Sequence, residues 1–343
     1  MKILIATGIY PPDIGGPAYY AEGLHKAFSS MGHKAVVASY GKERGLPTGL
    51  RHLFYFFRIC RNIIGADLLI VLDTYSAAMP AMAASKIFRK KTIVRTGGDF
   101  LWENYVERTK DKIFLSDFYR ADRKFNLKEK VIFYLTNLIL RSADAVVFST
   151  LWQAGIFEKA YSLPEEKIFL IENRFGERKT GEIPAQKNFL WAGRQIALKN
   201  VGTLKRAFSL AKKENKSLKL DLKTNLPREE LLLLIKKCYA VILPSYSEVS
   251  PNFILDAVAF GKPFILTKDC GYAGKLKGLG LFVDPFNAED IKEKILLLAE
   301  PENYQGCAER AASFGQTHSY EEIASEFLSL AKNIRVPLEN QQI

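Results

Sequence analysis

Cysteine and histidine are scarce in this chain of 343 residues, which contains four of each. Cys60, Cys238, Cys270 and Cys307 lie far apart, with no CxxC pair and no histidine at metal-ligand spacing beside them. This pattern predicts buried free thiols rather than disulfides or a zinc site. An acidic DxD-like metal-binding motif in a suitable loop is also absent, which agrees with a site that needs no metal ion.

Long hydrophobic runs are absent too. The most apolar stretch, residues 63–84, is interrupted by Asp67 and Asp73 and contains Pro80, which disfavours a transmembrane helix. The opening residues MKILIATG are too few for the apolar core of a signal peptide and predict a buried first strand. We therefore expect a cytoplasmic protein without a transmembrane segment.

Neither a GxGxxG motif nor a Walker phosphate loop occurs, which disfavours dinucleotide redox cofactors and ATP hydrolysis. What the chain has in excess is positive charge: its formal net charge is +12, and most of the excess lies before residue 178. A basic surface suits nucleic acid, anionic lipid or phosphorylated substrates equally well. Because RNP, zinc-finger and helix-turn-helix patterns are missing, we expect no nucleic-acid partner.

Short apolar runs alternate with segments of helical periodicity along most of the chain, which predicts parallel sheets with crossover helices. A polar stretch with two glycines and a proline, residues 175–188, has the character of an interdomain linker. The predicted fold class is α/β, with one doubly wound domain over residues 1–180 and a second over 181–317. An S-x-x-E capping box, Ser319 to Glu322, begins a last helix within 318–335, which we expect to pack back toward the N-terminal domain.

Three segments have the composition of ligand-binding loops. The first follows the first strand and brings Gly15 and Gly16 to the start of a helix, where backbone N–H groups can approach an anion closely. A turn that needs positive φ explains the same glycines equally well. In the second segment, Arg194 and Lys199 follow the strand at 189–192 and offer two cations at the edge where α/β sheets bind ligands. A solvated surface loop is the competing interpretation.

The third segment runs from a strand end through a long polar loop into a helix and places two carboxylates, Glu248 and Asp256, eight residues apart. Free N–H groups at the helix start, near Asn252 and Phe253, lie between them. Such an arrangement can hold a polyhydroxylated ligand between two acceptors while its phosphate contacts the amides. A helix-surface charge at Asp256 and a cap at Glu248 are the structural alternatives.

At these three segments together, the sequence resembles the retaining GT-B glycosyltransferases, the group 1 or family 4 type that includes bacterial mannosyltransferases, glycogen synthases and sucrose synthases. The passage from Glu248 to Asp256 is similar to the family's E-x7-E motif, with aspartate in the second place. The resemblance implies two Rossmann-like domains that face each other across a cleft. It also implies metal-independent transfer of a sugar from a nucleoside-diphosphate sugar, which is a co-substrate rather than a cofactor, to a glycan, a lipid-linked molecule or another hydroxyl acceptor.

The resemblance also implies roles for the residues singled out above. Arg194 and Lys199 would neutralise the diphosphate, Glu248 would contact the donor sugar, and Asp256 the ribose hydroxyls. Gly15, Gly16 and the amides of Asn252 and Phe253 would complete the donor site. The acceptor would bind mainly to the N-terminal domain.

Two departures from the family pattern stand out. Where many relatives carry a histidine after the fourth strand, this chain has Asp99, which is a candidate for a contact with the donor sugar or the acceptor hydroxyl, or simply a helix cap. The segment between Lys199 and Pro244 is short and lacks the usual glycine-rich turn. The nucleotide base therefore cannot be assigned from the sequence.

Residues 51–61 combine bulky apolar side chains with three arginines, and residues 108–141 contain nine lysines and arginines against four acids. A helix of this kind can lie on an anionic membrane, which favours peripheral contact with its inner face. The alternative is that the apolar side chains of residues 51–61 face the protein core.

Other functions remain open at this stage. A GT-B-fold nucleotide-sugar epimerase keeps the fold and the donor site, and a non-catalytic anion-binding or nucleic-acid-binding protein could use the same basic residues. A phosphorylase would need a lysine that holds pyridoxal phosphate, and nothing in the sequence singles one out. A glycosidase would explain the two carboxylates but not the phosphate-binding cations.

Overall fold

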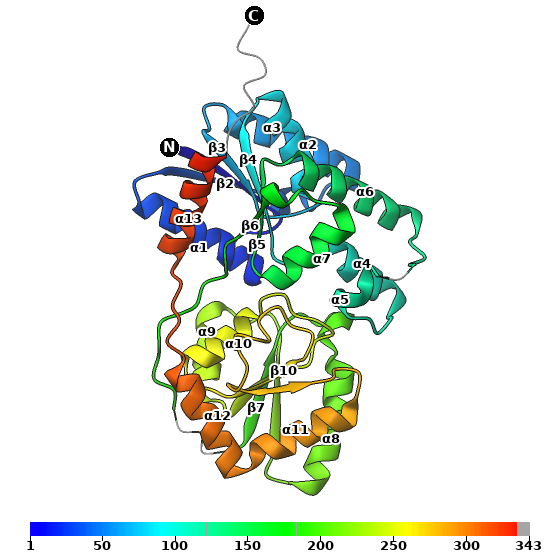
Figure 1. Cartoon of the computed structure of the whole chain (residues 1–343), viewed down its shortest axis with the longest axis vertical. Helices are drawn as coiled ribbons and strands as arrows, with labels where there is room; N and C mark the ends of the chain where they lie inside the picture. Colours follow the sequence, from blue (N-terminus) through cyan, green and yellow to red (C-terminus); the bar gives the residue numbers. More distant parts are fainter. Residues whose placement is uncertain (121, 183, 185, 335–343) are drawn as a thin grey trace, which may run out of the picture. The chain divides into compact units, whose positions relative to one another are not determined.

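The computed structural model describes residues 1–120, 122–182, 184 and 186–334. It contains a six-stranded and a five-stranded sheet, both parallel throughout the described strand pairs, in agreement with the predicted α/β class (Figure 1). The chain divides into two compact units, each built around one sheet. Unit 1 comprises 1–101, 125–172 and the C-terminal segment from Ser319, and unit 2 comprises 102–124 and 173–318.

Unit 1 is a doubly wound domain with strand order β2-β1-β3-β4-β5-β6. Its strands alternate with helices because buried apolar runs alternate with amphipathic segments along the sequence. Its elements are β1 Lys2–Thr7, α1 Gly16–Ser30, β2 Lys34–Ser39, α2 Thr48–Ile63, β3 Leu68–Val71, α3 Ala78–Ile87, β4 Lys91–Thr96, α6 Leu127–Ser142, β5 Ala145–Phe148, α7 Leu151–Tyr161, β6 Ile168–Leu170 and α13 Tyr320–Asn333. Short 3-10 turns lie at Tyr40–Glu43 and Glu165–Lys167.

The helices of unit 1 form two layers. The helices α2, α3, α6 and α7 all connect strands in one direction along the sheet, so the right-handed crossover rule predicts them on one face. On the opposite face α1 packs beside α13, and Phe28, Ile323 and Phe327 share a core with the sheet residues Ile5 and Ile70. The last helix of the chain is therefore part of the first unit.

Unit 2 has strand order β11-β10-β9-β7-β8. Its core is continuous from β7 to α12 and includes Trp191, Phe264 and Ile291, all fully buried. Its elements are α5 Leu115–Phe118, β7 Asn188–Ala192, the 3-10 turn η3 Ala197–Lys199, α8 Val201–Glu214, β8 Lys219–Lys223, α9 Arg228–Lys237, β9 Ala240–Leu243, α10 Asn252–Ala259, β10 Phe264–Thr267, β11 Leu281–Val283, α11 Ala288–Ala299 and α12 Pro301–Ser313.

The division between the units differs from the contiguous domains 1–180 and 181–317 that the sequence suggested. Helix α4, Phe100–Thr109, begins in unit 1, but the segment from Trp102 to Lys124 groups with unit 2. The change to unit 2 after β6 falls at Asn173 rather than near residue 180. Residues 183 and 185 of the predicted linker, and residue 335 of the predicted last helix, lie outside the described residues.

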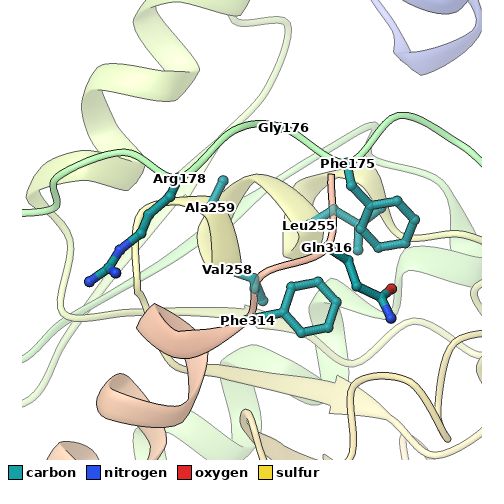
Figure 2. A pocket seen from close by; sticks show the side chains of 8 residues that line it. All are labelled: Phe175, Gly176, Arg178, Leu255, Val258, Ala259, Phe314 and Gln316. Atoms are coloured by element: carbon teal, nitrogen blue, oxygen red, sulfur yellow. The ribbon is translucent and has the colours of Figure 1, made fainter. Parts of the chain in front are cut away.

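Two segments that lead into and out of unit 2 are paired with each other. The backbones of Phe175 and His318 exchange two N–H···O bonds of 3.1 Å in an antiparallel bridge. Figure 2 shows the small recess beneath them, where Phe175 and Phe314 lie over Leu255 and Val258 of α10. None of the site residues predicted from the sequence lines this recess, so we regard it as a packing seam.

The thiols follow the sequence-based expectation in part. Cys238, Cys270 and Cys307 are buried, Cys60 is half-buried, and all four are free. Burial raises the pKa of Cys238 and that of Cys270 to about 12, so both are protonated and unreactive at neutral pH. No helix of the described residues is long and apolar enough to cross a membrane.

Candidate functional site

The candidate site in unit 2 lies where the strand order of its sheet reverses. The chain passes from β7 outward to β8 and then returns to β9 on the other side of β7. Loops that follow two such strands diverge and leave room for a ligand at the carboxyl ends of the strands, the position where open α/β sheets bind ligands. The loop after β7 carries Arg194 and Lys199, and the loop after β9 carries Glu248.

These two loops are joined by direct contacts. The Lys199 Nζ atom lies 2.5 Å from Glu248 Oε1, and both side chains are mostly buried. The Tyr246 amide donates to the Leu198 carbonyl at 2.8 Å. The structure therefore brings together a cation and a carboxylate that are 49 residues apart in the sequence.

Asn200 fixes the backbone beside this pair. It adopts a left-handed conformation (φ 56°), which asparagine tolerates better than most residues, and it ends the 3-10 turn that carries Lys199. Its side-chain amide donates to the carbonyls of Pro244 at 3.1 Å and Pro285 at 2.6 Å. One side chain thus ties three loops at the carboxyl edge of the sheet.

The polar loop after β9 continues into α10, whose first residues are Asn252 and Phe253. Pro251 precedes the helix and makes no side-chain cap. The side chain of Asn252 accepts a hydrogen bond from Asn173 at 3.1 Å, which orients its amide within unit 2. Early amides of a helix favour anions because they lack intrahelical acceptors.

Asp256 is the second carboxylate of the motif, and it is not a solvated surface charge. Only 9% of the residue is exposed, and its two oxygens accept hydrogen bonds from the guanidinium of Arg228 at the start of α9. No local sequence pattern indicates Arg228, because this contact spans 28 residues and depends on how α9 packs beside α10. A bidentate pair of this type is strong and geometrically specific.

Arg194 differs from Lys199 in its surroundings. Its side chain is 60% exposed, and its Nη2 atom lies 3.3 Å from Glu103 on α4. Glu107, one turn further along α4, accepts a 2.8 Å hydrogen bond from the Ala197 amide. The same amide and the cation of Lys110 hold the pKa of Glu107 below its ordinary value, with Lys110 the larger influence. The segment 102–124 therefore brings two carboxylates to the loop that carries the candidate phosphate-binding cations.

A buried serine anchors this segment further along. Ser247 donates to Asp269 at 2.5 Å and accepts the Leu115 amide at 2.8 Å. Phe114 packs against Phe286, with ring centroids 4.8 Å apart. Sequence analysis missed these contacts, although the motif loop that contains Ser247 was recognised.

The remaining predicted residues lie in unit 1, at the corresponding edge of its own sheet. Gly15 precedes α1 with φ 153°, a value that side chains rarely adopt, and Gly16 is the first residue of the helix. The strand order of this sheet reverses between β1 and β3. The loop that carries both glycines therefore has the same topological position in unit 1 as the Lys199 loop has in unit 2.

Asp73 is a second polar group at this edge, and the sequence analysis did not single it out. It follows β3, and its carboxylate accepts hydrogen bonds from the amides of Tyr75 at 2.6 Å and Ala77 at 3.0 Å. Burial raises the pKa of Asp73, and the backbone hydrogen bonds oppose that rise. An aspartate at the end of a continuous apolar run, LLIVLD, is the signal that could have identified it.

Asp99 lies one residue before α4 and is only 3% exposed. Its neighbour Gly98 accepts hydrogen bonds from Thr96 at 2.7 Å and Gln153 at 3.0 Å, which fixes the turn after β4. This position directly before the helix agrees with the helix-cap interpretation, whereas the burial of Asp99 leaves little of it accessible to a ligand in this conformation. Within the described residues, no cluster of three or more histidine, cysteine, aspartate or glutamate side chains could hold a metal ion.

Comparison with known proteins identifies the domain that contains most of these residues. Residues 174–314 match the model of a protein family described as Glycosyl transferases group 1. This domain belongs to the group 1 glycosyltransferases. The match includes Arg194, Lys199, Glu248 and Asp256 within its limits.

A curated protein similar to part of this chain comes from Campylobacter jejuni: N,N'-diacetylbacillosaminyl-diphospho-undecaprenol alpha-1,3-N-acetylgalactosaminyltransferase, 32% identical over 106 residues. That match spans 30% of this chain and only 28% of the relative's length.

Solved structures resemble the whole chain. Sucrose-phosphate synthase from Thermosynechococcus elongatus has a TM-score of 0.71 at 15% identity, covering 96% of this chain and 98% of its own. Anabaena HepE, solved in complex with UDP-glucose, has a TM-score of 0.66 at 16% identity, covering 97% and 98%. These likenesses show the GT-B fold, and with it the predicted pair of α/β domains.

Proposed function

We propose that this protein is a retaining glycosyltransferase that moves a sugar from a nucleoside-diphosphate sugar to a hydroxyl acceptor. The observation that carries the proposal is the Lys199–Glu248 pair at the strand reversal of unit 2, directly before the amides that begin α10. A cation, a carboxylate and free helix-start amides suit a diphosphate joined to a polyhydroxylated sugar. Membership of this domain in the group 1 family supports the same reading.

The chemistry we propose is stabilisation of the leaving group. Negative charge develops on the departing diphosphate, and positioned cations in a partly buried site lower the barrier because they need no reorganisation during the reaction. Lys199 and Arg194 supply this charge, and the amides of Asn252 and Phe253 donate hydrogen bonds to the phosphate oxygens. This arrangement assigns no step to a metal ion.

Glu248 would accept hydrogen bonds from the sugar hydroxyls, while its contact with Lys199 holds the carboxylate in place. Asp256 would accept the ribose hydroxyls. Its pairing with Arg228 is compatible with that role, because two carboxylate oxygens have about four lone-pair sites and a bidentate arginine uses two of them. The Arg228 contact would orient the carboxylate for the ribose.

For unit 1 we propose the acceptor side of the reaction. The Gly15–Gly16 turn would offer backbone amides to the donor diphosphate. Asp99 would contact the donor sugar or the acceptor hydroxyl. Because Asp99 is only 3% exposed, this role requires the turn after β4 to open on ligand binding.

We propose further that the acceptor is a lipid-linked glycan or another glycoconjugate at the inner face of a membrane. Two observations support this part of the proposal. The name of the Campylobacter jejuni relative includes a glycan on diphospho-undecaprenol, and the chain carries a net charge of +12, which favours contact with anionic lipid.

A thermal-shift experiment tests the donor site. UDP-glucose, GDP-mannose and ADP-glucose are added in turn to the purified protein, each with and without EDTA, beginning with the uridine sugar because HepE was solved with UDP-glucose. One nucleotide sugar should raise the melting temperature regardless of EDTA, since a ligand at 100 times its Kd stabilises the folded state by about 2.7 kcal/mol. No shift with any of them would refute the proposed donor site.

Matched arginine variants sharpen the test. Arg194→Ala should abolish the ligand-induced shift while leaving the unliganded melting temperature nearly unchanged, because its surface ion pair contributes about 1 kcal/mol or less. Arg206→Ala, at an exposed arginine on α8, should keep the full shift. Release of nucleoside diphosphate only when an acceptor is present would separate a transferase from an epimerase, which converts the donor alone.

A further inference from the structure

Helix α2 exposes its bulky apolar side chains instead of burying them. Leu53, Phe54 and Phe57 are 48%, 55% and 61% exposed. The side of the helix that meets the sheet is formed by Tyr55 and Ile59, which are fully buried. The structure therefore rejects the interpretation that the apolar residues of 51–61 as a group face the protein core.

Helix α6 repeats this arrangement. Val131, Tyr134 and Leu138 recur at helical spacing and are 43%, 66% and 51% exposed. The opposite side of α6 is buried through Ile132 and Ile139. Two helices of unit 1 thus each present an apolar stripe to solvent, although an isolated exposed side chain would need no explanation.

The two stripes point the same way. Helices α2 and α6 belong to the layer on one face of the sheet, and α3 follows the strand between theirs and contacts both. Helices packed as one layer bury the side toward the sheet and expose the side away from it. We call the outward surface formed by Leu53, Phe54, Phe57, Val131, Tyr134 and Leu138 the outer helical face.

Charge on these helices is almost entirely of one sign. Arginine and lysine occur seven times in α2, α3 and α6, and the one acid among them, Glu129, is 2% exposed and forms the capping box of α6 with Asn126. The exposed cations lie along the edges and ends of the stripes: Arg61, Lys86, Lys128, Lys130 and Arg141. An apolar stripe bordered by cations is the pattern of surfaces that rest in the headgroup region of an anionic bilayer.

We infer that the outer helical face is a docking surface for an anionic lipid bilayer. The aromatic and aliphatic side chains enter the interface between headgroups and acyl chains, while the surrounding cations contact lipid phosphates. A second copy of this chain fits poorly, because a twofold contact through this face would bring the same cations of both copies together. The link to a lipid-linked acceptor rests on the proposed function, whereas the surface itself does not.

Vesicle co-sedimentation of the full chain tests the inference. The protein should pellet with phosphatidylglycerol vesicles, and much less with phosphatidylcholine vesicles or at high salt, because the cations contribute through screened attraction. The double variant Phe54→Glu/Phe57→Glu should bind the anionic vesicles more weakly, by about tenfold or more. Both changes place a negative charge in the apolar interface. Both positions are exposed, so folding should be retained.

Leu233→Glu is the matched control, because Leu233 lies on α9 of unit 2 and is 57% exposed. It should bind vesicles like the unchanged protein. Equal binding by the Phe54→Glu/Phe57→Glu variant, or no binding by the unchanged protein, would overturn the inference. A lipid-free dimer that this variant converts to a monomer would instead assign the face to a second copy.

The donor thermal shift separates this inference from the proposed function. The Phe54→Glu/Phe57→Glu variant should keep the nucleotide-sugar shift, because neither residue belongs to the candidate site. Loss of vesicle binding with the shift retained supports the docking surface alone. Absence of the shift in every protein, with vesicle binding intact, would refute the donor site and leave the docking surface standing.

Discussion

Asp73 carries an electrostatic cost that the structure only partly offsets. Burial disfavours its charged form, and the amide hydrogen bonds from Tyr75 and Ala77 favour that form, yet the net effect is a raised pKa. At pH values in the window between 3.8, the ordinary pKa of an aspartate, and the raised pKa of Asp73, the folded protein binds a proton at this site that the unfolded chain does not. The contribution of Asp73 to stability is therefore full below this window and falls as the pH rises through it.

This fall in stability with rising pH gives a prediction for Asp73→Asn. The stability of the unchanged protein relative to the variant should increase as the pH is lowered from neutrality through the window, because asparagine does not titrate. Urea denaturation of both proteins at a series of pH values measures the difference. A constant difference across that range would show that Asp73 has an ordinary pKa.

The sequence singled out the candidate residues of unit 2 one at a time, but not their contacts. Lys199 and Glu248 stand out because each follows a buried strand. Their 2.5 Å contact depends on β9 lying directly beside β7, which is a property of the strand order. The partner of Asp256, Arg228, is set in the same way by helix packing, so no local pattern could have indicated it.

At the scale of elements, the strongly periodic segments were predicted well. The strands of both sheets occur at apolar runs that alternate with helices, as the pattern predicted, and the capping box of α13 forms through Ser319 and Glu322. The sequence pattern did not reveal α4, α5 and α12. The helix α5 has four residues and α12 is largely polar, whereas α4 has a buried apolar stripe, Leu101, Trp102, Tyr105 and Val106, within only ten residues. In α2, two apolar stripes compete, so the pattern alone could not say which one faces the sheet.

The missed segment 102–124 also gives a prediction. Ser247→Ala removes the hydroxyl that joins Leu115 to Asp269, leaving a buried amide without its acceptor, which should cost about 1–3 kcal/mol. Hydrogen exchange should accelerate in residues 102–120 more than in the sheet of unit 2. Ser209→Ala, at an exposed serine of α8, should leave both quantities unchanged. Uniform acceleration across unit 2 would mean that Ser247 supports the whole domain rather than this segment.

At the scale of the molecule, each unit is assembled from separate stretches of the chain. Unit 1 takes its last helix from beyond residue 318, and unit 2 takes residues 102–124, which include most of α4 and all of α5. Composition and periodicity predicted two α/β domains but not this exchange, because grouping in space depends on contacts between distant segments. The capping box predicted the last helix, and its expected return to the first domain agrees with its place in unit 1.

Phe327→Ala tests the contribution of α13 to unit 1. Phe327 is fully buried against the sheet of that unit, so its truncation should destabilise unit 1 by about 3–5 kcal/mol. Hydrogen exchange followed by mass spectrometry should show faster exchange in peptides of β1 and β3, and unchanged exchange in peptides of β9 and β10. Equal loss of protection in both units would indicate that they unfold as one cooperative body.

The exchange of segments also affects the order in which the two units can fold during synthesis on the ribosome. Synthesis begins with unit 1, yet the core of that unit lacks Ile323 and Phe327 until almost the whole chain has emerged. Unit 2 receives its earliest piece, residues 102–124, before its sheet exists, and all its parts are present once residue 318 has been made. The unit that starts first is thus the last to be completed, and a nascent chain arrested at residue 318 would carry a finished second unit and an open face on its first.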